Sequence, residues 1–256
     1  MEINLKGKIA LITGATGQLG RVMARTLASC GADIAVCYNK NSSMADRLIN
    51  EIKTMSCRAI AIQADVTSED SVNLMRDKIK AELGDPNIVV NNAVIQYEWK
   101  SILEQNPIDF QGQFDSCIMQ SVLTAKAFIP AMAANGSGRF IGINTECSAL
   151  CEFNTGAYAS AKRGMDGLYR VLAKEIGAKG VTVNQVAPGW TISDKDRKEN
   201  TKDHGEFSES PYAKSVPLSR RGTDQEIANV VLFLASDLAS FVTGVCIPVS
   251  GGNVMV

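Results

Sequence analysis

The chain has 256 residues with 26 basic and 27 acidic side chains, which leaves a net charge of −1. A chain of this length buries roughly three-quarters of the surface that its unfolded form exposes, so its core needs no disulfide or metal. The balanced charge excludes the basic surfaces with which proteins bind nucleic acids or anionic membranes. We find no signal peptide and no segment of ~18 apolar residues that would span a membrane, so we expect a cytoplasmic protein.

Short apolar segments alternate with helical patterns along the chain. The predicted strands cover residues 9–13, 33–38, 59–64, 87–91, 139–144, 181–186 and 245–249. The predicted helices cover residues 19–30, 42–55, 68–83, about 111–134, 156–178 and 223–235. The strand segments are almost continuously apolar, which indicates strands that are buried on both faces. The alternation predicts one α/β domain over residues 1–256, doubly wound and of Rossmann type, whose parallel seven-stranded sheet carries helices on both faces.

Residues 191–221 interrupt this alternation. The segment is rich in charged residues, serine, threonine and glycine, and it contains Pro211 and Pro217. A long insertion in a compact α/β domain is either a disordered surface loop or an active-site lid. Because the segment follows the carboxyl end of a predicted strand, where ligands bind in such sheets, we favour a lid.

The turn between the first strand and the first helix is rich in glycine. It reads Thr13-Gly14-Ala15-Thr16-Gly17-Gln18-Leu19-Gly20. Glycines let a backbone approach a pyrophosphate, and a helix N-terminus offers N–H groups and the positive end of its dipole. Glycines at this spacing also occur in plain strand–helix turns. Asp65-Val66 and Asn91-Asn92-Ala93, which follow the third and fourth strands, favour a dinucleotide site because they lie at further carboxyl ends.

The end of the second strand bears on the choice of dinucleotide. An acidic residue there would bind the ribose 2′-hydroxyl of NAD, and residues 34–45 contain none. The segment offers Asn39 and Lys40 instead, and Lys40 is either a partner for a 2′-phosphate or a solvated surface lysine. We therefore expect NADP rather than NAD.

Tyr158 and Lys162 lie four residues apart in a predicted helix, so their side chains share one face. A free tyrosine titrates near pH ~10, and a neighbouring cation lowers that pKa because it favours the phenolate. The pair therefore predicts a proton donor that works near neutral pH. The one histidine, His204, lies in a charged segment, and the seven cysteines lack metal-site spacing. We expect no bound metal and reduced, mostly buried thiols.

Together these residues resemble the short-chain dehydrogenase/reductase family over essentially the whole chain. The markers are the turn 13–20, Asp65, the segment 91–93, Tyr158 with Lys162, Asn184, Pro188-Gly189 and the segment 250–252. The C-terminal segment 221–244 is similar to that of 3-oxoacyl-carrier-protein reductases and of polyol or sugar dehydrogenases. The resemblance implies a small carbonyl or alcohol substrate and a homo-oligomer, either a dimer or a tetramer.

The resemblance also implies residue roles. Tyr158 would be the general acid or base, and Lys162 would bind the nicotinamide ribose and lower the tyrosine pKa. The remaining cofactor ligands would be Gly14, Thr16, Gln18, Leu19, Gly20, Asn39, Lys40, Asp65, Val66, Asn92, Ala93, Pro188, Gly189 and Thr191. Substrate contacts would come from Gln96, Tyr97, Trp99, Trp190 and Tyr212, and a carrier protein would need a basic patch such as Arg220 with Arg221.

The chain departs from the family pattern at four positions. Gln18 and Val94 stand where glycines are usual. Thr145, thirteen residues before Tyr158, replaces the catalytic serine, with Ser148 as a less well aligned alternative. Cys117 replaces an asparagine of the middle helix and offers poorer hydrogen bonding than an amide. The sequence thus predicts an NADP-dependent reductase or dehydrogenase, acting on a 3-oxoacyl thioester or on a sugar or polyol; the alternative is a catalytically weakened, dinucleotide-binding regulatory protein.

Overall fold

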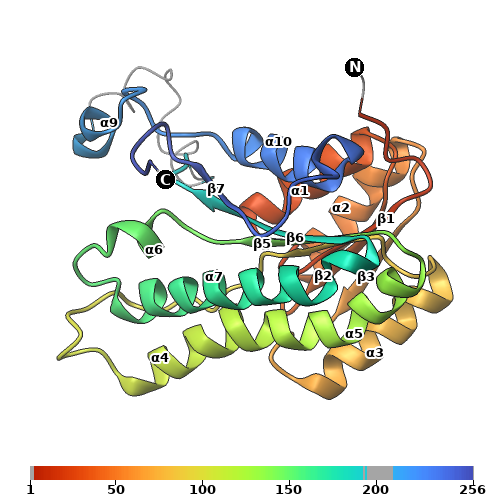
Figure 1. The fold of residues 1–256 in the computed structure, drawn as a ribbon, viewed down its shortest axis with the longest axis horizontal. Helices are drawn as coiled ribbons and strands as arrows, with labels where there is room; N and C mark the ends of the chain where they lie inside the picture. The colour runs from red at the N-terminus through yellow and green to blue at the C-terminus, as the bar shows by residue number, and fades with distance from the viewer. Residues whose placement is uncertain (1–2, 193, 195–209, 256) are drawn as a thin grey trace.

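Seven parallel strands form the central layer of the fold (Figure 1). The computed structural model describes residues 3–192, 194 and 210–255. The strands are β1 (Ile9–Ile12), β2 (Asp33–Tyr38), β3 (Ala59–Gln63), β4 (Ile88–Asn91), β5 (Gly138–Ile143), β6 (Val181–Pro188) and β7 (Cys246–Val249). They pair in the order β3-β2-β1-β4-β5-β6-β7, every pair parallel. The predicted doubly wound parallel sheet is therefore confirmed.

The strand order places the direction change between β1 and β4. The chain moves outward from β1 to β3, returns to β4 beside β1, and then moves outward to β7. Ile12 near the carboxyl end of β1 pairs with Val36 on one side and with Val90 on the other. Helices on opposite faces leave a crevice at such a point, and ligands of doubly wound sheets bind there.

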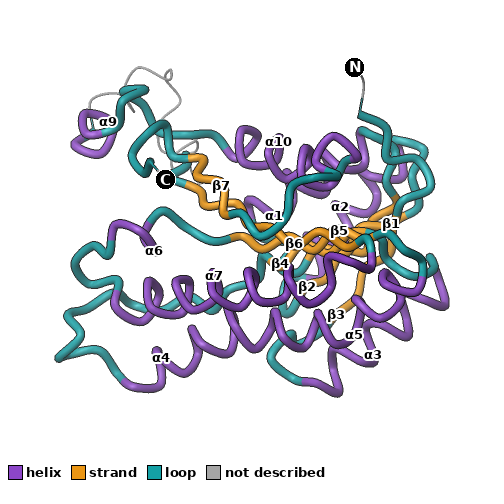
Figure 2. Tube along the Cα trace, viewed as in Figure 1, coloured by secondary structure: helices purple, strands orange, loops and turns teal. Residues whose placement is uncertain are grey.

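Helices cover both faces of the sheet, as the layers in Figures 1 and 2 show. The helices of one face are α1 (Gln18–Ser29), α2 (Ser42–Thr54) and α10 (Asp224–Ala235). Those of the other face are α3 (Glu69–Glu82), α4 (Pro107–Phe114), α5 (Gln120–Ala134) and α7 (Gly156–Ile176). Successive residues of a strand point to opposite faces, so in β1 Ala10 and Ile12 join one core and Ile9 and Leu11 the other. This explains why the strand segments are continuously apolar.

The middle helix is longer and less regular than predicted. Helical structure runs from Pro107 to Ala134, starting at an Asn106 cap about four residues before the predicted start, and it includes a π-helical turn, η1 (Asp115–Met119). By length and hydropathy this stretch could cross a membrane, which the sequence reading did not anticipate, although half of its most apolar window is buried. Its packing against α3 and α7 accounts for that composition as a core helix.

The segment after β6 is only partly described. Thr191 forms an isolated parallel bridge with Gly222, and a short helix, α9 (Pro211–Ser215), begins at Ser210. The predicted lid of residues 191–221 falls mainly on residues outside the described part of the chain, and so does His204. The seven cysteines are free thiols, but only Cys37, Cys57 and Cys117 are buried. The expectation of mostly buried thiols is wrong because others lie on surface elements, two of them in α6 (Cys147–Leu150).

Candidate functional site

Two adjoining cavities lie along the carboxyl ends of the strands. The turn cavity, of about 640 Å³, is lined by ten of the predicted cofactor residues: Gly14, Thr16, Gln18, Leu19, Asn39, Lys40, Asp65, Val66, Asn92 and Ala93. The tyrosine cavity, of about 560 Å³, is lined by Thr145, Tyr158, Lys162, Pro188, Gly189 and Thr191 among others. Leu19 and Asn92 line both, so the two cavities form one groove. The structure thus gathers all predicted site residues except Gly20 around one groove.

The glycine turn depends on close backbone packing. Gly14 has φ +60°, and a Cβ on it would lie 2.9 Å from Ala93 Cα. A Cβ on Gly20 would lie 2.4 Å from the carbonyl oxygen of Gly14 and 2.7 Å from Ala15 Cα. Gly20 lines neither cavity and instead lets α1 pack beneath the turn. Its predicted role as a direct pyrophosphate ligand therefore gives way to a packing role.

Asn92 fixes the turn from the neighbouring strand β4. Its Nδ2 donates to the carbonyl oxygens of Thr13 at 3.0 Å and Gly14 at 3.1 Å, and its backbone N–H donates to Thr13 Oγ1 at 2.9 Å. Thr13 Oγ1 in turn donates to Gln120 Oε1 at 2.7 Å. These bonds span the direction change in the sheet, so they hold the floor of the groove in one conformation.

Gln18 explains one departure from the family pattern. Its Nε2 donates to the Ile192 carbonyl at 2.6 Å, and its Oε1 accepts from the Asp194 N–H at 2.9 Å. Arg21 pairs with the Asp194 carboxylate and also donates to the Thr16 carbonyl at 2.8 Å. The residue in the place of a glycine therefore ties the turn to the segment that follows β6.

The groove fits a dinucleotide. The first turn of α1 carries no acidic residue, so its N–H groups and dipole are available to a pyrophosphate. Exposed Lys40 lies at the end of β2, where it suits a 2′-phosphate. Asp65 is the acid lining the turn cavity, and its Oδ1 already accepts from the Thr67 N–H at 2.9 Å and Thr67 Oγ1 at 2.7 Å.

Thr145, Tyr158 and Lys162 meet in the tyrosine cavity from the end of β5 and from α7. Lys162 Nζ lies 5.7 Å from the centroid of the Tyr158 ring and donates to the Ile143 carbonyl at 2.5 Å. The Thr145 side chain hydrogen-bonds Tyr158. Ser148 instead donates to the Thr145 carbonyl at 2.8 Å and does not line this cavity. The geometry therefore favours Thr145 over Ser148 as the hydroxyl beside the tyrosine.

Burial controls the protonation of this pair. It raises the pKa of the Tyr158 phenol, with further increases from Cys117 and Cys147 that outweigh the lowering by the Thr145 hydrogen bond. It also lowers the pKa of the Lys162 ammonium, opposed by a hydrogen bond from Cys117. The expected lowering of the tyrosine pKa by Lys162 is not seen here because desolvation of the phenolate dominates. The phenol is therefore protonated at neutral pH.

Aromatic residues of the loop after β4 position Tyr158. The backbone N–H of Tyr158 donates to Tyr97 Oη at 3.0 Å, and Trp99 stacks on its ring at 6.1 Å between centroids. All five predicted substrate contacts, Gln96, Tyr97, Trp99, Trp190 and Tyr212, line the tyrosine cavity. The sequence gave no role to Glu146, which lines the same cavity; its only signal was an acid directly after Thr145.

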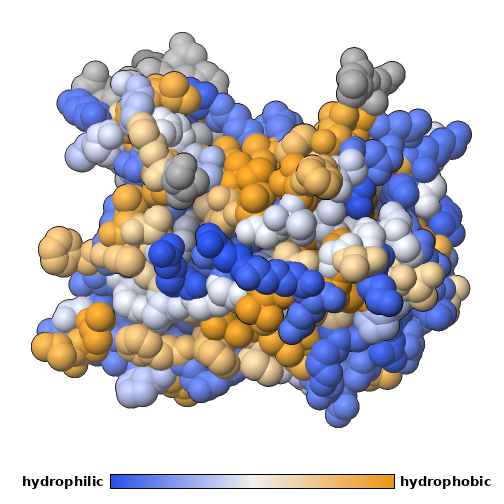
Figure 3. All heavy atoms as spheres, in the orientation of Figure 1, coloured by the Kyte–Doolittle hydropathy of each residue, from blue (hydrophilic) through white to orange (hydrophobic). Residues whose placement is uncertain are grey.

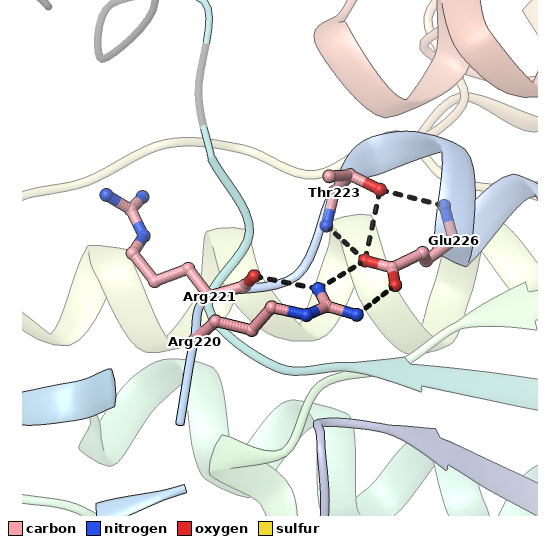
Figure 4. A network of polar contacts seen from close by, with 4 residues as sticks. All are labelled: Arg220, Arg221, Thr223 and Glu226. Carbon is pink, nitrogen blue, oxygen red and sulfur yellow. Dashed lines mark hydrogen bonds and ion pairs between the residues drawn. The ribbon is translucent and has the colours of Figure 1, made fainter. Parts of the chain in front are cut away.

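The two arginines before α10 are engaged within the chain. Figure 4 shows Arg220 bonded to Glu226, with N–O distances of 3.0 and 2.5 Å. Glu226 also forms a capping box with Thr223 at the start of α10. The Arg221 side chain extends away from this network, and its guanidinium lies 4.4 Å from the centroid of Trp190. The basic patch considered for a carrier protein is therefore largely neutralised.

Comparisons with known proteins agree with this geometry. A family model described as enoyl-(acyl carrier protein) reductase matches residues 14–253. The 3-oxoacyl-(acyl-carrier-protein) reductase of Pseudomonas aeruginosa is 33% identical over 99% of this chain and 100% of its own. A solved 7α-hydroxysteroid dehydrogenase, complexed with NADH and 7-oxoglycochenodeoxycholic acid, superposes with a TM-score of 0.88 at 32% identity, covering 97% and 95% of the two chains. A gluconate 5-dehydrogenase from Burkholderia cenocepacia, complexed with NADP and tartrate, gives 0.87 at 27% identity, covering 98% and 96%.

Proposed function

Because this chain belongs to the short-chain dehydrogenase/reductase family, we propose that it is an NADPH-dependent oxidoreductase that interconverts a carbonyl group and an alcohol. The resemblance read from the sequence is confirmed, and with it the assignment as a nucleotide-binding oxidoreductase. The finer proposal, which concerns the cofactor, the catalytic residues and the substrate, is supported by one observation above the others. Thr145, Tyr158 and Lys162 line one end of a groove whose other end is the glycine turn.

Each residue of the trio has a part in proton transfer. Tyr158 donates its proton to the carbonyl oxygen, and its raised pKa keeps the phenol in the protonated state that a donor needs. Thr145 donates a hydrogen bond to the same oxygen and so stabilises the charge that develops there. Lys162 faces the Tyr158 ring and holds the nicotinamide ribose. When bound, the nicotinamide supplies or accepts the hydride.

The choice of NADPH rests on the end of β2. Asn39 and Lys40 line the turn cavity there, and the segment contains no acid that would repel a 2′-phosphate. The pyrophosphate would lie at the N-terminus of α1, over the turn that begins at Gly14. Pro188, Gly189 and Thr191, at the end of β6, would contact the carboxamide.

Two substrate classes follow from the relatives. A 3-oxoacyl thioester is suggested by the carrier-protein reductases, and a sugar or polyol by the gluconate dehydrogenase. A regulatory protein that binds the dinucleotide without turnover is the second candidate function, because Cys117 and Thr145 depart from the family. The contact between Thr145 and Tyr158 favours the enzyme.

We also propose a cytoplasmic homo-oligomer, either a dimer or a tetramer. Apolar side chains gather over the region of α10 in Figure 3, and Leu238 and Phe241, just after this helix, are exposed. Ile108 and Phe114 of α4 and Val171 of α7 are exposed on the opposite face. Light scattering in solution tests this proposal, and a strictly monomeric protein would contradict it.

The test of the activity is NADPH oxidation against a panel of ketones, aldoses and acetoacetyl thioesters, followed by absorbance. Tyr158→Phe keeps the ring and removes the proton donor, so it should lower turnover by about 10²–10⁴-fold while the protein still folds and binds NADPH. An active Tyr158→Phe variant would refute the assignment of the acid. A wild type that binds NADPH but reduces no carbonyl would favour the regulatory protein.

A further inference from the structure

Glu146 places a carboxylate in the tyrosine cavity, directly after Thr145. Its side chain is held rather than loose, because Oε2 accepts from Tyr212 Oη at 3.1 Å and from Asn253 Nδ2 at 3.0 Å. Tyr212 Oη also accepts from the Trp190 N–H at 2.9 Å. The ends of β5 and β6, helix α9 and the C-terminal segment thus converge on one carboxylate, of which only 6% is exposed.

The second oxygen of this carboxylate remains available. Oε1 accepts no hydrogen bond from the part of the chain that the structure describes, and it is not among the polar atoms that are shut off from solvent without a partner. Among the described residues Glu146 has no cationic partner either. Burial accordingly raises the pKa of this carboxyl. A carboxylate that is desolvated without an ion pair is costly, and such groups concentrate at functional sites.

The charges around the cavity restrict what it can accept. Among the described residues that line it, the acids are Glu146 and Glu152 and the cation is Lys162, which already faces Tyr158. An anionic substrate would meet repulsion from the two carboxylates. The Trp190 face that could attract a cationic substrate already carries the Arg221 guanidinium. A neutral hydrogen-bond donor suits this cavity better than either ion.

Resting on the proposed oxidoreductase function, we propose that Glu146 determines substrate specificity: its Oε1 accepts a hydrogen bond from a hydroxyl group on the carbon next to the reacting carbonyl. Glu146 adjoins Thr145, so a substrate whose carbonyl oxygen meets Thr145 and Tyr158 brings its neighbouring carbon to Glu146. The substrates are neutral hydroxyketones and the matching diols, as in sugars and polyols, rather than 3-oxoacyl thioesters. The amide of Gln96, which lines the same cavity, offers both donors and an acceptor to further hydroxyl groups.

The size of the preference follows from the unpaired oxygen. A site built to bond a substrate hydroxyl rejects an analogue that lacks it, by as much as about 10⁴-fold, because its polar group is then desolvated without a partner. Since the tyrosine cavity opens to the rest of the groove, solvent can partly replace the hydroxyl, so we expect a smaller preference of about 10²-fold.

The experiment compares 1-hydroxy-2-butanone with 2-butanone as NADPH-dependent substrates, with 1-amino-2-butanone and acetoacetyl-coenzyme A as the other arms. Wild type should prefer the hydroxyketone to butanone by about 10²-fold in kcat/KM. Glu146→Gln replaces a charge-assisted hydrogen bond by a neutral one, so the preference should fall about tenfold. Glu152→Gln is the matched control, because it removes the exposed carboxylate of the same cavity and should leave the preference unchanged.

Binding measurements separate this inference from the proposed activity. With NADP⁺ present, 1,2-butanediol should bind wild type at least tenfold more tightly than 2-butanol by calorimetry, and Glu146→Gln should reduce that ratio. A diol preference without turnover would support the inference and contradict the enzyme. Turnover with equal rates on both butanones, or with the aminoketone or the thioester preferred, would overturn the inference and leave the oxidoreductase intact. Thermal unfolding checks that Glu146→Gln is folded; should it fail to fold, Asn253→Ala releases the same carboxylate, and an unchanged preference there would count against the inference.

Discussion

Replacing Gly20 with alanine should damage the glycine turn, because the added methyl group has no room. Its Cβ would lie 2.4 Å from the Gly14 carbonyl oxygen and 2.7 Å from Ala15 Cα, and both are backbone atoms that cannot rotate away. Overpacking of this kind costs about 1–3 kcal/mol. Alanine within a helix regains up to about 1 kcal/mol over glycine. The expected net loss is therefore about 1–2 kcal/mol.

A loss of this size should lower the thermal unfolding midpoint by about 2–8 °C in a chain of this length. The shifted turn should also weaken NADPH binding by at least about tenfold, because the Gly14 carbonyl must move and Asn92 bonds to that carbonyl. Differential scanning fluorimetry and fluorescence titration with NADPH measure the two effects on one preparation.

Gly167→Ala is the matched control. Gly167 lies within α7, and a Cβ there would have no neighbour within 4 Å. The same chemical change should therefore raise the unfolding midpoint by up to about 4 °C through helix propensity, with NADPH affinity unchanged. If Gly20→Ala behaves like Gly167→Ala in both assays, the packing account of the turn is refuted.

Three further outcomes are expected. Lys40→Ala should weaken NADPH binding by about 10–100-fold and leave NADH binding unchanged in the same titration, since it removes one charge-assisted contact; equal losses for both would exclude a 2′-phosphate ligand. Thr145→Val should reduce kcat about 10²-fold, Thr145→Ser should be tolerated and Ser148→Ala should matter little; the reverse order in steady-state kinetics would make the serine the working hydroxyl. Hydrogen bonds from Arg220 lower the pKa of Glu226 from its ordinary 4.5 to about 2, so ionised Glu226 stabilises the fold above pH 4.5 and this contribution is lost as the pH falls towards 2. Glu226→Ala should cost about 1 kcal/mol in urea unfolding at pH 7 and almost nothing near pH 2, and a difference independent of pH would contradict this.

The sequence predicted the fold well because local patterns determined it. The continuous apolar runs marked strands buried on both faces, and Thr13 to Gly20 marked the turn that opens α1. The carboxyl ends of parallel strands meet at one edge, so Asp65 and Asn92 were placed in the groove without knowledge of their contacts.

The contacts that were missed join residues far apart in the sequence. Gln18 bonds to Ile192, 174 positions away, and Glu146 bonds to Asn253, 107 positions away. No local period or spacing encodes such a partner. The direction of the Tyr158 pKa was also missed, because the effect of a neighbouring cation can be read from spacing whereas the depth of burial cannot.

The π-helical turn of residues 115–119 has a consequence for how this protein can change length. The Gln120 N–H bonds to the Asp115 carbonyl, so this turn holds one residue more than an α-helical turn does. Side chains support it, since Ser116 Oγ donates to the Gly112 carbonyl at 2.8 Å and Ser121 Oγ to the Cys117 carbonyl at 2.8 Å. A one-residue deletion elsewhere in a core helix rotates all that follows by about 100°. Deleting one residue here would restore regular α-helical bonding and leave the facing surfaces of α4 and α5 in place. The turn is therefore the position at which the core helix can gain or lose a residue during evolution, and Cys117 lies within it.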